Sequence, residues 1–139
     1  PGFLGNRLQH AMWREAISLR EKNIASAEDI DKVVKYGFGA RMPFIGPLET
    51  ADLAGLALTC DIHKYLFPYL DSSQNPSPAL ENLVAAGATG VRAGRGFYEW
   101  TPQKVQQVIE QRDAVLLRII HEIVAPASAL DRKDPSRNG

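Results

Sequence analysis

The chain has 139 residues, with 16 basic and 16 acidic side chains and therefore no formal net charge. This balance argues against binding to nucleic acid or to an anionic membrane surface, because both require clustered positive charge. Apolar runs are too short to span a bilayer. The single cysteine, Cys60, excludes an intramolecular disulfide and a thiolate metal cluster, and it favours a reducing, cytoplasmic setting.

The first predicted element is a helix from Leu4 to Lys22, because apolar residues recur there at every third or fourth position. Asn23 is expected to end it. A second helix is expected after Ser26, whose hydroxyl can cap the first turn, and it should end at Gly37. Residues 37–47 then form a predicted loop with unusually many apolar side chains, so we expect this loop to fold back onto a core or to line a pocket.

A long helix is predicted from Leu48 to about Phe67, where Pro68 bends or ends it. Its apolar residues lie nearly all round, so we expect the helix to be central and buried. Cys60 is then expected to be a buried, inert thiol. Asp52 would be a carboxylate in apolar surroundings, and we favour its pairing with a loop N–H group or with an arginine such as Arg41 over a catalytic role.

Two further helices complete the predicted fold. Ser77 caps a short helix that ends at Gly87, and a helix of about 22 residues begins at Pro102 and is closed by Pro126. The sequence therefore predicts an all-α bundle of about five helices over residues 1–126. Residues 127–139 have almost nothing to bury and are expected to form a disordered tail.

The glycine-rich segment between these helices does not match a nucleotide-binding motif. Gly94 and Gly96 give a G-x-G pattern, but no strand precedes them and no suitable helix follows. We favour a glycine-permitted turn that ends in aromatic side chains. The alternative is that Arg92 and Arg95 bind a phosphate-bearing ligand.

The sequence offers no metal site, because the three histidines are far apart and none lies at metal-ligand spacing. None has a neighbouring nucleophile either. Asn6 is the polar residue that we single out near the start of the chain, one helical turn before His10. From the residues alone, a local backbone hydrogen bond at the helix start is favoured for Asn6 over ligand binding.

The order of several short motifs is more informative than any one of them. The series consists of Pro1–Leu8, Glu28–Asp31, Gly46–Glu49, Asp52, Gly55–Leu56 and Gly94–Trp100. Taken together, the series closely resembles the C-terminal domain of the NAD-dependent 3-hydroxyacyl-CoA dehydrogenases, over about residues 1–100. The helix after Pro102 resembles a subgroup-specific extension.

This resemblance implies a division of labour between two domains. The family has a Rossmann domain first, which binds NAD and carries a catalytic His–Glu pair, and this N-terminal domain is absent from the chain. The helical domain then supplies a wall of the substrate cleft and much of a homodimer interface. The implied reaction is hydride transfer between NAD and the C3 hydroxyl carbon of a 3-hydroxyacyl-CoA or a related 3-hydroxy acid.

The resemblance also assigns candidate site residues. It makes Asn6 the best candidate for a catalytic residue, because the matching asparagine of the family lies near the substrate and the catalytic histidine. The loop then resembles substrate-cleft wall, through Met42, Pro43, Phe44, Gly46 and Pro47. This loop looks longer than in the fatty-acid-oxidising members, so carnitine or a sugar acid remains an alternative to acyl-CoA.

Two further expectations concern the chain as a unit. Its start at Pro1, without a methionine, suggests a processed product or a fragment of a longer protein. Because the His–Glu pair and the NAD site are missing, we expect no dehydrogenase activity from this chain alone. The alternative is a stand-alone helical protein-interaction module without catalysis.

Overall fold

The computed structural model describes the backbone of residues 2–130 and the side chains of residues 2–122. Within this range it contains six α-helices and three short 3-10 helices, and no β-strand. The prediction of an all-α fold is therefore confirmed. Most of the predicted tail, residues 127–139, lies outside the described residues.

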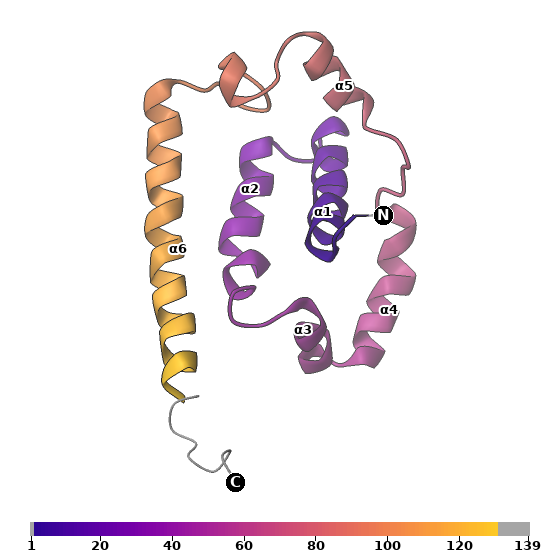
Figure 1. Cartoon of the computed structure of the whole chain (residues 1–139). Helices are drawn as coiled ribbons and strands as arrows, with labels where there is room; N and C mark the ends of the chain where they lie inside the picture. The colour runs from indigo at the N-terminus through magenta and orange to yellow at the C-terminus, as the bar shows by residue number, and fades with distance from the viewer. Residues whose placement is uncertain (1, 131–139) are drawn as a thin grey trace. The chain divides into compact units, whose positions relative to one another are not determined.

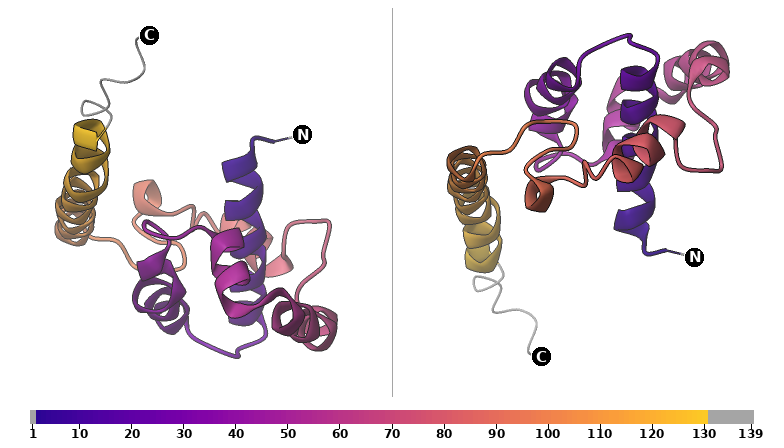
Figure 2. Two further views of the ribbon diagram at one scale, coloured as in Figure 1. Left: turned by 90° about the horizontal axis from the view of Figure 1, so that it is seen from below. Right: turned by 90° about the horizontal axis from the view of Figure 1, so that it is seen from above.

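The chain divides into two compact units, Pro1–Glu99 and Trp100–Gly139, where the sequence predicted one domain over 1–126. The first unit holds five helices, which Figure 1 shows in chain order from indigo to rose. They are α1 (Leu4–Glu21), α2 (Ala27–Tyr36), α3 (Pro47–Ala54), α4 (Leu56–Leu66) and α5 (Pro78–Ala85). The 3-10 helices are η1 (Phe38–Arg41), η2 (Phe67–Tyr69) and η3 (Val91–Ala93). Helix α1 contacts both α2 and α5, and Figure 2 shows α2 beside α1 in both views.

The local signals for helix ends are confirmed. The Ser26 hydroxyl accepts a hydrogen bond from the Asp29 N–H at 3.1 Å and caps α2. The Ser77 hydroxyl does the same for α5, accepting from the Leu80 N–H at 3.2 Å. Asn23 follows the end of α1 in a left-handed conformation, with φ at 55°.

The predicted long helix from Leu48 to Phe67 is wrong, because the structure divides it at Gly55. This glycine has φ at 95° and ψ at 123°, outside the helical region, and it ends α3 and begins α4. Its N–H still donates to the Ala51 and Asp52 carbonyl oxygens at 3.0 and 3.1 Å. A residue with no Cβ adopts this conformation without steric cost, and the spacing of apolar residues does not report it.

The prediction that this segment is buried is also wrong. The side chains of Leu48 and Leu53 are 80% and 79% exposed, and Cys60 is an exposed free thiol. The Asp52 side chain is exposed too, and its carboxylate has no hydrogen bond or ion pair to Arg41 or to any other described residue. The carboxylate that does stabilise this region is Glu49, which accepts a hydrogen bond from the Gly46 N–H at 2.7 Å and caps α3.

The first unit has almost no interior of its own. Among the described residues, no hydrophobic side chain is buried, and Ser18 alone falls in the buried class, at 2% exposure. Central positions of α1 remain open, for example Leu8 at 58% exposure. Burial of apolar surface is the main favourable term in folding, and the described residues of this unit bury little of it among themselves.

The second unit is dominated by one helix, α6 (Pro102–Leu130), drawn from orange to yellow in Figure 1. The predicted end at Pro126 is wrong, because the helix runs four residues further with Pro126 inside it. A proline at an interior position removes one backbone hydrogen bond, which weakens a helix without necessarily ending it. No helix in the described part of the chain is long and apolar enough to cross a membrane.

Candidate functional site

Asn6 lies in the first turn of α1 with its side chain exposed. Among the described residues it has no hydrogen-bond partner, so the local backbone bond that the residues alone favoured is not formed. One turn further on, the His10 ring contacts Trp13 edge-on, with ring centroids 4.9 Å apart. The Asn6 amide therefore keeps both its donor and its acceptor available for a ligand.

The expected loop is divided in the structure: its first part, η1, contacts α2, whereas the residues assigned to the substrate cleft do not fold back onto a core. Met42 is 50% exposed and Phe44 is 66% exposed. Gly46 is half-buried, and Pro47 begins α3. Neither of the two cavities described below is lined by residues 42–47. The role of Met42, Pro43, Phe44, Gly46 and Pro47 in substrate binding stays a prediction, which needs a second surface opposite the loop.

The larger cavity is a groove of about 1230 Å³ along α1, which the sequence did not predict. We call it the α1 groove, and its apolar lining includes Leu8, Ala11, Ile17, Ile30, Leu80 and Phe97. Arg7, Arg14 and Arg20 of α1 also line it. The signal in the sequence was the mixture of apolar and arginine side chains on α1, but only the fold brings the other walls to this helix.

One wall of the α1 groove is held by polar contacts from α1. The Asp71 N–H donates to the Glu15 carboxylate at 2.7 Å, and the Ala79 N–H donates to Glu21 at 3.1 Å. Arg14 reaches the Asp71 carboxylate at 3.9 Å. Hydrogen bonds from Ser73 lower the pKa of Asp71 to about 2, so its carboxylate stays charged throughout the physiological range.

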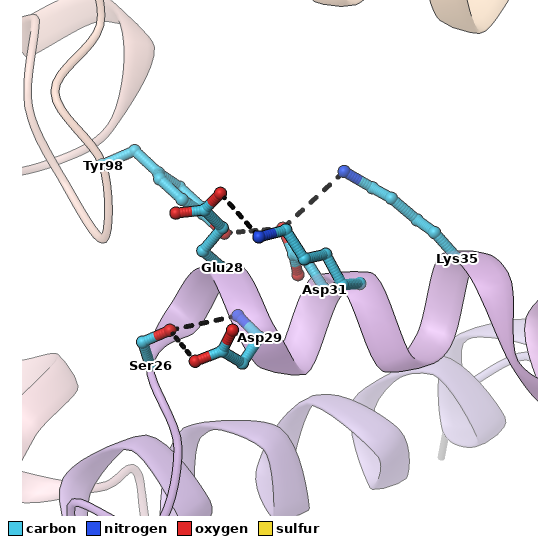
Figure 3. A network of polar contacts seen from close by, with 7 residues as sticks. Ser26, Glu28, Asp29, Asp31, Lys35 and Tyr98 are labelled. Atoms are coloured by element: carbon cyan, nitrogen blue, oxygen red, sulfur yellow. Dashed lines mark hydrogen bonds and ion pairs between the residues drawn. The ribbon is translucent and has the colours of Figure 1, made fainter.

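The opposite wall is fixed by Tyr98, whose hydroxyl donates to the Asp31 carboxylate on α2 at 2.8 Å (Figure 3). Burial raises the pKa of Tyr98 to about 12, and the hydrogen bond to Asp31 acts in the same direction. Lys35 lies 4.0 Å from the same carboxylate. Tyr98 is therefore a neutral hydrogen-bond donor that ties the glycine-rich turn to α2.

The glycine-rich turn itself is stabilised from within. The Gly90 N–H donates to the Arg95 carbonyl oxygen, and the Gly96 N–H donates to that of Tyr98, each at 2.8 Å. The Arg95 guanidinium donates to the Ala86 carbonyl oxygen at 2.8 Å. Arg95 is thus engaged in holding the turn, which supports the structural interpretation over a phosphate site.

The described residues do not fit a dinucleotide site. Such a site requires a parallel sheet and a helix whose N-terminus meets the pyrophosphate, whereas Gly94 and Gly96 lie in a turn joined by isolated antiparallel bridges. No group of three or more His, Cys, Asp or Glu side chains in the described range could hold a metal ion. In the described part of this unit, the candidates for substrate contact are the Asn6 amide and exposed apolar surface.

A smaller cavity of about 560 Å³ lies on α4, beside Cys60, His63 and Phe67. The His63 ring stacks on Phe67, with ring centroids 4.2 Å apart. This stacking occupies the imidazole face and gives it a packing role.

Known proteins resemble most of this chain. The sequence profile of the 3-hydroxyacyl-CoA dehydrogenase C-terminal domain matches residues 2–100. A probable 3-hydroxybutyryl-CoA dehydrogenase of Bacillus subtilis is 41% identical over 101 residues, which are 72% of this chain and 34% of that protein. The human mitochondrial hydroxyacyl-coenzyme A dehydrogenase is 40% identical over 106 residues, covering 72% of this chain and 32% of the relative.

Another relative matches a longer stretch. The 5-formyl-3-hydroxy-2-methylpyridine 4-carboxylate 5-dehydrogenase of Mesorhizobium japonicum is 29% identical over 119 residues, 86% of this chain and 38% of the relative. A crystal structure of a dehydrogenase of this name, described as an NAD⁺-dependent dismutase, superimposes with a TM-score of 0.83 at 29% identity. It covers 87% of this chain, and the chain covers 39% of it.

The chain thus spans about a third of the length of the curated relatives that it matches. The profile match includes the Asn6 motif at the start of α1 and the turn that Tyr98 anchors. With an all-α structure and a profile match over most of its length, the chain belongs to the 3-hydroxyacyl-CoA dehydrogenase family, whose C-terminal domain it represents.

Proposed function

We propose that the chain supplies the substrate-cleft wall and the dimer interface of an NAD-dependent 3-hydroxyacyl-CoA dehydrogenase-like enzyme. The profile match over residues 2–100 is the observation that carries the proposal. The substrate would be a 3-hydroxyacyl-CoA or a related 3-hydroxy acid, oxidised at its C3 hydroxyl carbon. NAD would accept the hydride, bound by a part of the enzyme outside these helices.

The contribution of this chain to the chemistry would be to position the substrate. The Asn6 amide is exposed and unbonded at the first turn of α1, so it can hydrogen-bond a substrate carbonyl or a catalytic imidazole. Holding the reacting carbon of the substrate in line with the group that accepts its hydride can lower the activation barrier by several kcal/mol. The exposed apolar side chains of Met42 and Phe44 would then contact the substrate once the opposite wall of the cleft is present.

The longer match favours a second candidate substrate. The Mesorhizobium relative matches 119 residues, of which at least 20 must lie beyond the 99 residues of the first unit. The matches to the acyl-CoA dehydrogenases cover 72% of the chain. A small aromatic or hydroxy carboxylate is therefore the alternative to a CoA thioester.

A substrate assay on the full-length protein tests both candidates. The protein from the source gene is assayed for NAD reduction with 3-hydroxybutyryl-CoA and, separately, with a pyridine hydroxy-carboxylate or aldehyde. Turnover of the thioester supports the first candidate, and turnover of the carboxylate alone supports the second. Failure of both, with capture of a folded partner protein, would favour the stand-alone interaction module.

The Asn6→Ala variant of the same protein tests the site. We expect kcat/KM to fall by about 10²-fold, because without the Asn6 amide the reacting carbon is no longer held in line with the group it reacts with. The matched control is Gln9→Ala, on the same helix and exposed, which should leave kcat/KM unchanged. Since Asn6 has no partner in the described chain, its removal should not change the unfolding midpoint, and full activity of Asn6→Ala would contradict its role.

Three further parts of the proposal follow from the same family membership. The 139-residue chain by itself should not reduce NAD, because its described residues do not fit a dinucleotide site. The exposed apolar surface of its helices would be covered in a homodimer. The lone thiol of Cys60 fits a reducing, cytoplasmic location.

A further inference from the structure

His10 lies on the same face of α1 as Asn6, one helical turn further along the chain. At about 100° per residue, the two side chains leave the helix only about 40° apart around its axis, with their Cβ atoms about 5–6 Å apart. Trp13 leaves it about 20° to the other side of Asn6. All three side chains are exposed. A molecule that contacts the Asn6 amide can therefore reach the His10 ring at the same time.

The His10 ring is oriented by packing, and its nitrogens are left for a ligand. The ring meets Trp13 edge-on, at an interplanar angle of 72°, which restricts its rotation without a hydrogen bond. Among the described residues, neither ring nitrogen has a hydrogen-bond partner. At least one imidazole nitrogen always carries a hydrogen. His10 thus presents an N–H donor beside the Asn6 amide.

The part of α1 that carries this pair is cationic. Arg7, His10 and Arg14 all line the α1 groove, whereas the first acidic residue of the helix is Glu15. Arg7 and His10 are three positions apart, so their side chains are neighbours on the helix surface. A negatively charged group next to His10 would be attracted by both.

The acids that line the same groove are already bound. They are Asp31 and Asp71, the two acidic residues among those that line the groove in the described part of the chain. Asp31 accepts the Tyr98 hydroxyl, and Asp71 lies 3.9 Å from the Arg14 guanidinium. Neither is therefore an unpaired charge that would compete with a ligand for His10.

A free carboxylate close to the reacting carbon fits this arrangement. In a 3-hydroxy acid the carboxylate is two carbon–carbon bonds from the carbon that bears the hydroxyl, so both groups fall within the 5.4 Å of one turn of α1. An N–H group binds an ionised acceptor about twice as strongly as a neutral one. A CoA thioester is uncharged at the same place, because its phosphates lie at the far end of the pantetheine arm.

We propose that His10 is a specificity-determining residue, which binds the free carboxylate of a 3-hydroxy acid while Asn6 faces the carbon that is oxidised. This rests on the proposed function and selects the 3-hydroxy acid over the CoA thioester as its substrate class. His10 takes no part in the transfer of hydride. Its contribution is to hold the end of the substrate next to the reacting carbon.

The test compares acids with their neutral esters on the full-length protein. NAD reduction is measured with 3-hydroxybutyrate and with 3-(hydroxymethyl)benzoate, each alongside its methyl ester, for the unmodified protein and for His10→Leu. We expect the unmodified protein to prefer at least one acid over its ester by tenfold or more in kcat/KM. His10→Leu should raise KM for that acid at least tenfold and leave the ester unchanged, because one charge-assisted hydrogen bond is lost.

Gln9→Leu is the matched control. Gln9 is exposed on the same turn of α1 but does not line the α1 groove, so this variant should keep the preference for the acid. Circular dichroism of both variants reports whether the helices persist. A merely structural role of His10 would change the acid and the ester alike.

Binding separates this proposal from the proposed function. Isothermal titration calorimetry with NAD present measures the Kd of each acid and ester for the same proteins. If nothing is oxidised but an acid binds at least tenfold more weakly to His10→Leu than to the unmodified protein, the dehydrogenase function fails and the carboxylate site stands.

Three outcomes would overturn the role of His10. The first is an unmodified protein that neither turns over nor binds the acids better than their esters. The second is an acid whose KM and Kd are the same in His10→Leu as in the unmodified protein. The third is turnover of 3-hydroxybutyryl-CoA with no turnover of either acid, which would leave the dehydrogenase function intact and exclude the carboxylate.

Discussion

At the scale of single residues, Tyr98 shows how one hydrogen bond links distant parts of the chain. Its hydroxyl donates to Asp31, which is 67 positions earlier in the sequence, and so joins the glycine-rich turn to α2 (Figure 3). Asp71 has a similar role on the other side of the α1 groove, where its backbone meets Glu15. These contacts position the groove walls. Both residues have a shifted pKa, which burial raises in Tyr98 and hydrogen bonds from Ser73 lower in Asp71.

The pKa of Tyr98 leads to a prediction for alkaline pH. The folded-state pKa of about 12 lies above the ordinary value of 10, so the contribution of Tyr98 to stability is complete below about pH 10 and is lost as the pH rises through about 12. In an ultraviolet titration of the four tyrosines, one should ionise late, and Tyr98→Phe should remove that late step.

The free energy of unfolding tests the same hydrogen bond of Tyr98. Tyr98→Phe should lower the free energy of unfolding by about 1–2 kcal/mol near neutral pH, because it removes a hydrogen bond to a carboxylate. Tyr36→Phe is the matched control, since Tyr36 is 81% exposed, and it should change stability little. A late ionisation step that survives in Tyr98→Phe would contradict the assignment.

At the scale of elements, the division between α3 and α4 depends on Gly55. Its φ of 95° lies in a region that side chains with a Cβ rarely adopt, although no atom crowds the position of a Cβ. A glycine is therefore required here by the backbone conformation, and not by crowding around the position of a Cβ.

Substitution of Gly55 separates this requirement from ordinary helix propensity. Gly55→Ala should destabilise the chain by about 1–3 kcal/mol, the usual cost of holding such a conformation with a side chain. Gly5→Ala, within α1 and with nothing within 4 Å of its Cβ position, should stabilise by about 0.5–1 kcal/mol. Urea unfolding of both variants measures the difference, and equal effects of the two would show that Gly55 does not carry the strain.

At the scale of the whole molecule, the dominant fact is the absence of a buried apolar side chain in the described range. Side chains cap helices α2, α3 and α5, but the apolar surfaces of the helices meet no interior in the described range. We therefore expect association with another copy to add to the hydrophobic burial of these helices.

Association makes stability depend on protein concentration. If the chain folds as a homodimer, a tenfold rise in its concentration should raise the apparent free energy of unfolding by about 1.4 kcal/mol and shift the thermal midpoint upward. Thermal unfolding at two concentrations tests this expectation. A midpoint that does not change with concentration would mean that the chain is stable as a monomer.

Local features were predictable from the sequence because they depend on neighbours along the chain. Ser26 and Ser77 cap helices, Gly37 ends one, and Pro102 begins one, all through contacts within a few residues. The ordered series of short motifs identified the family, which the profile match confirms. That series also singled out Asn6, whose role stays a prediction although its exposure suits it.

The predictions that failed required knowledge of what each surface meets. The apolar segment around Leu53 and Cys60 was interpreted as buried, but apolar composition does not specify whether the covering surface belongs to the same chain. The sequence thus determined the all-α class, the helix ends at Ser26, Gly37 and Ser77, and the family, but not the division at Gly55 or the end of α6. Tertiary structure alone decided the α1 groove, the links from Tyr98 and Asp71, and the open apolar surfaces, because these depend on residues that are far apart in the sequence and close in space.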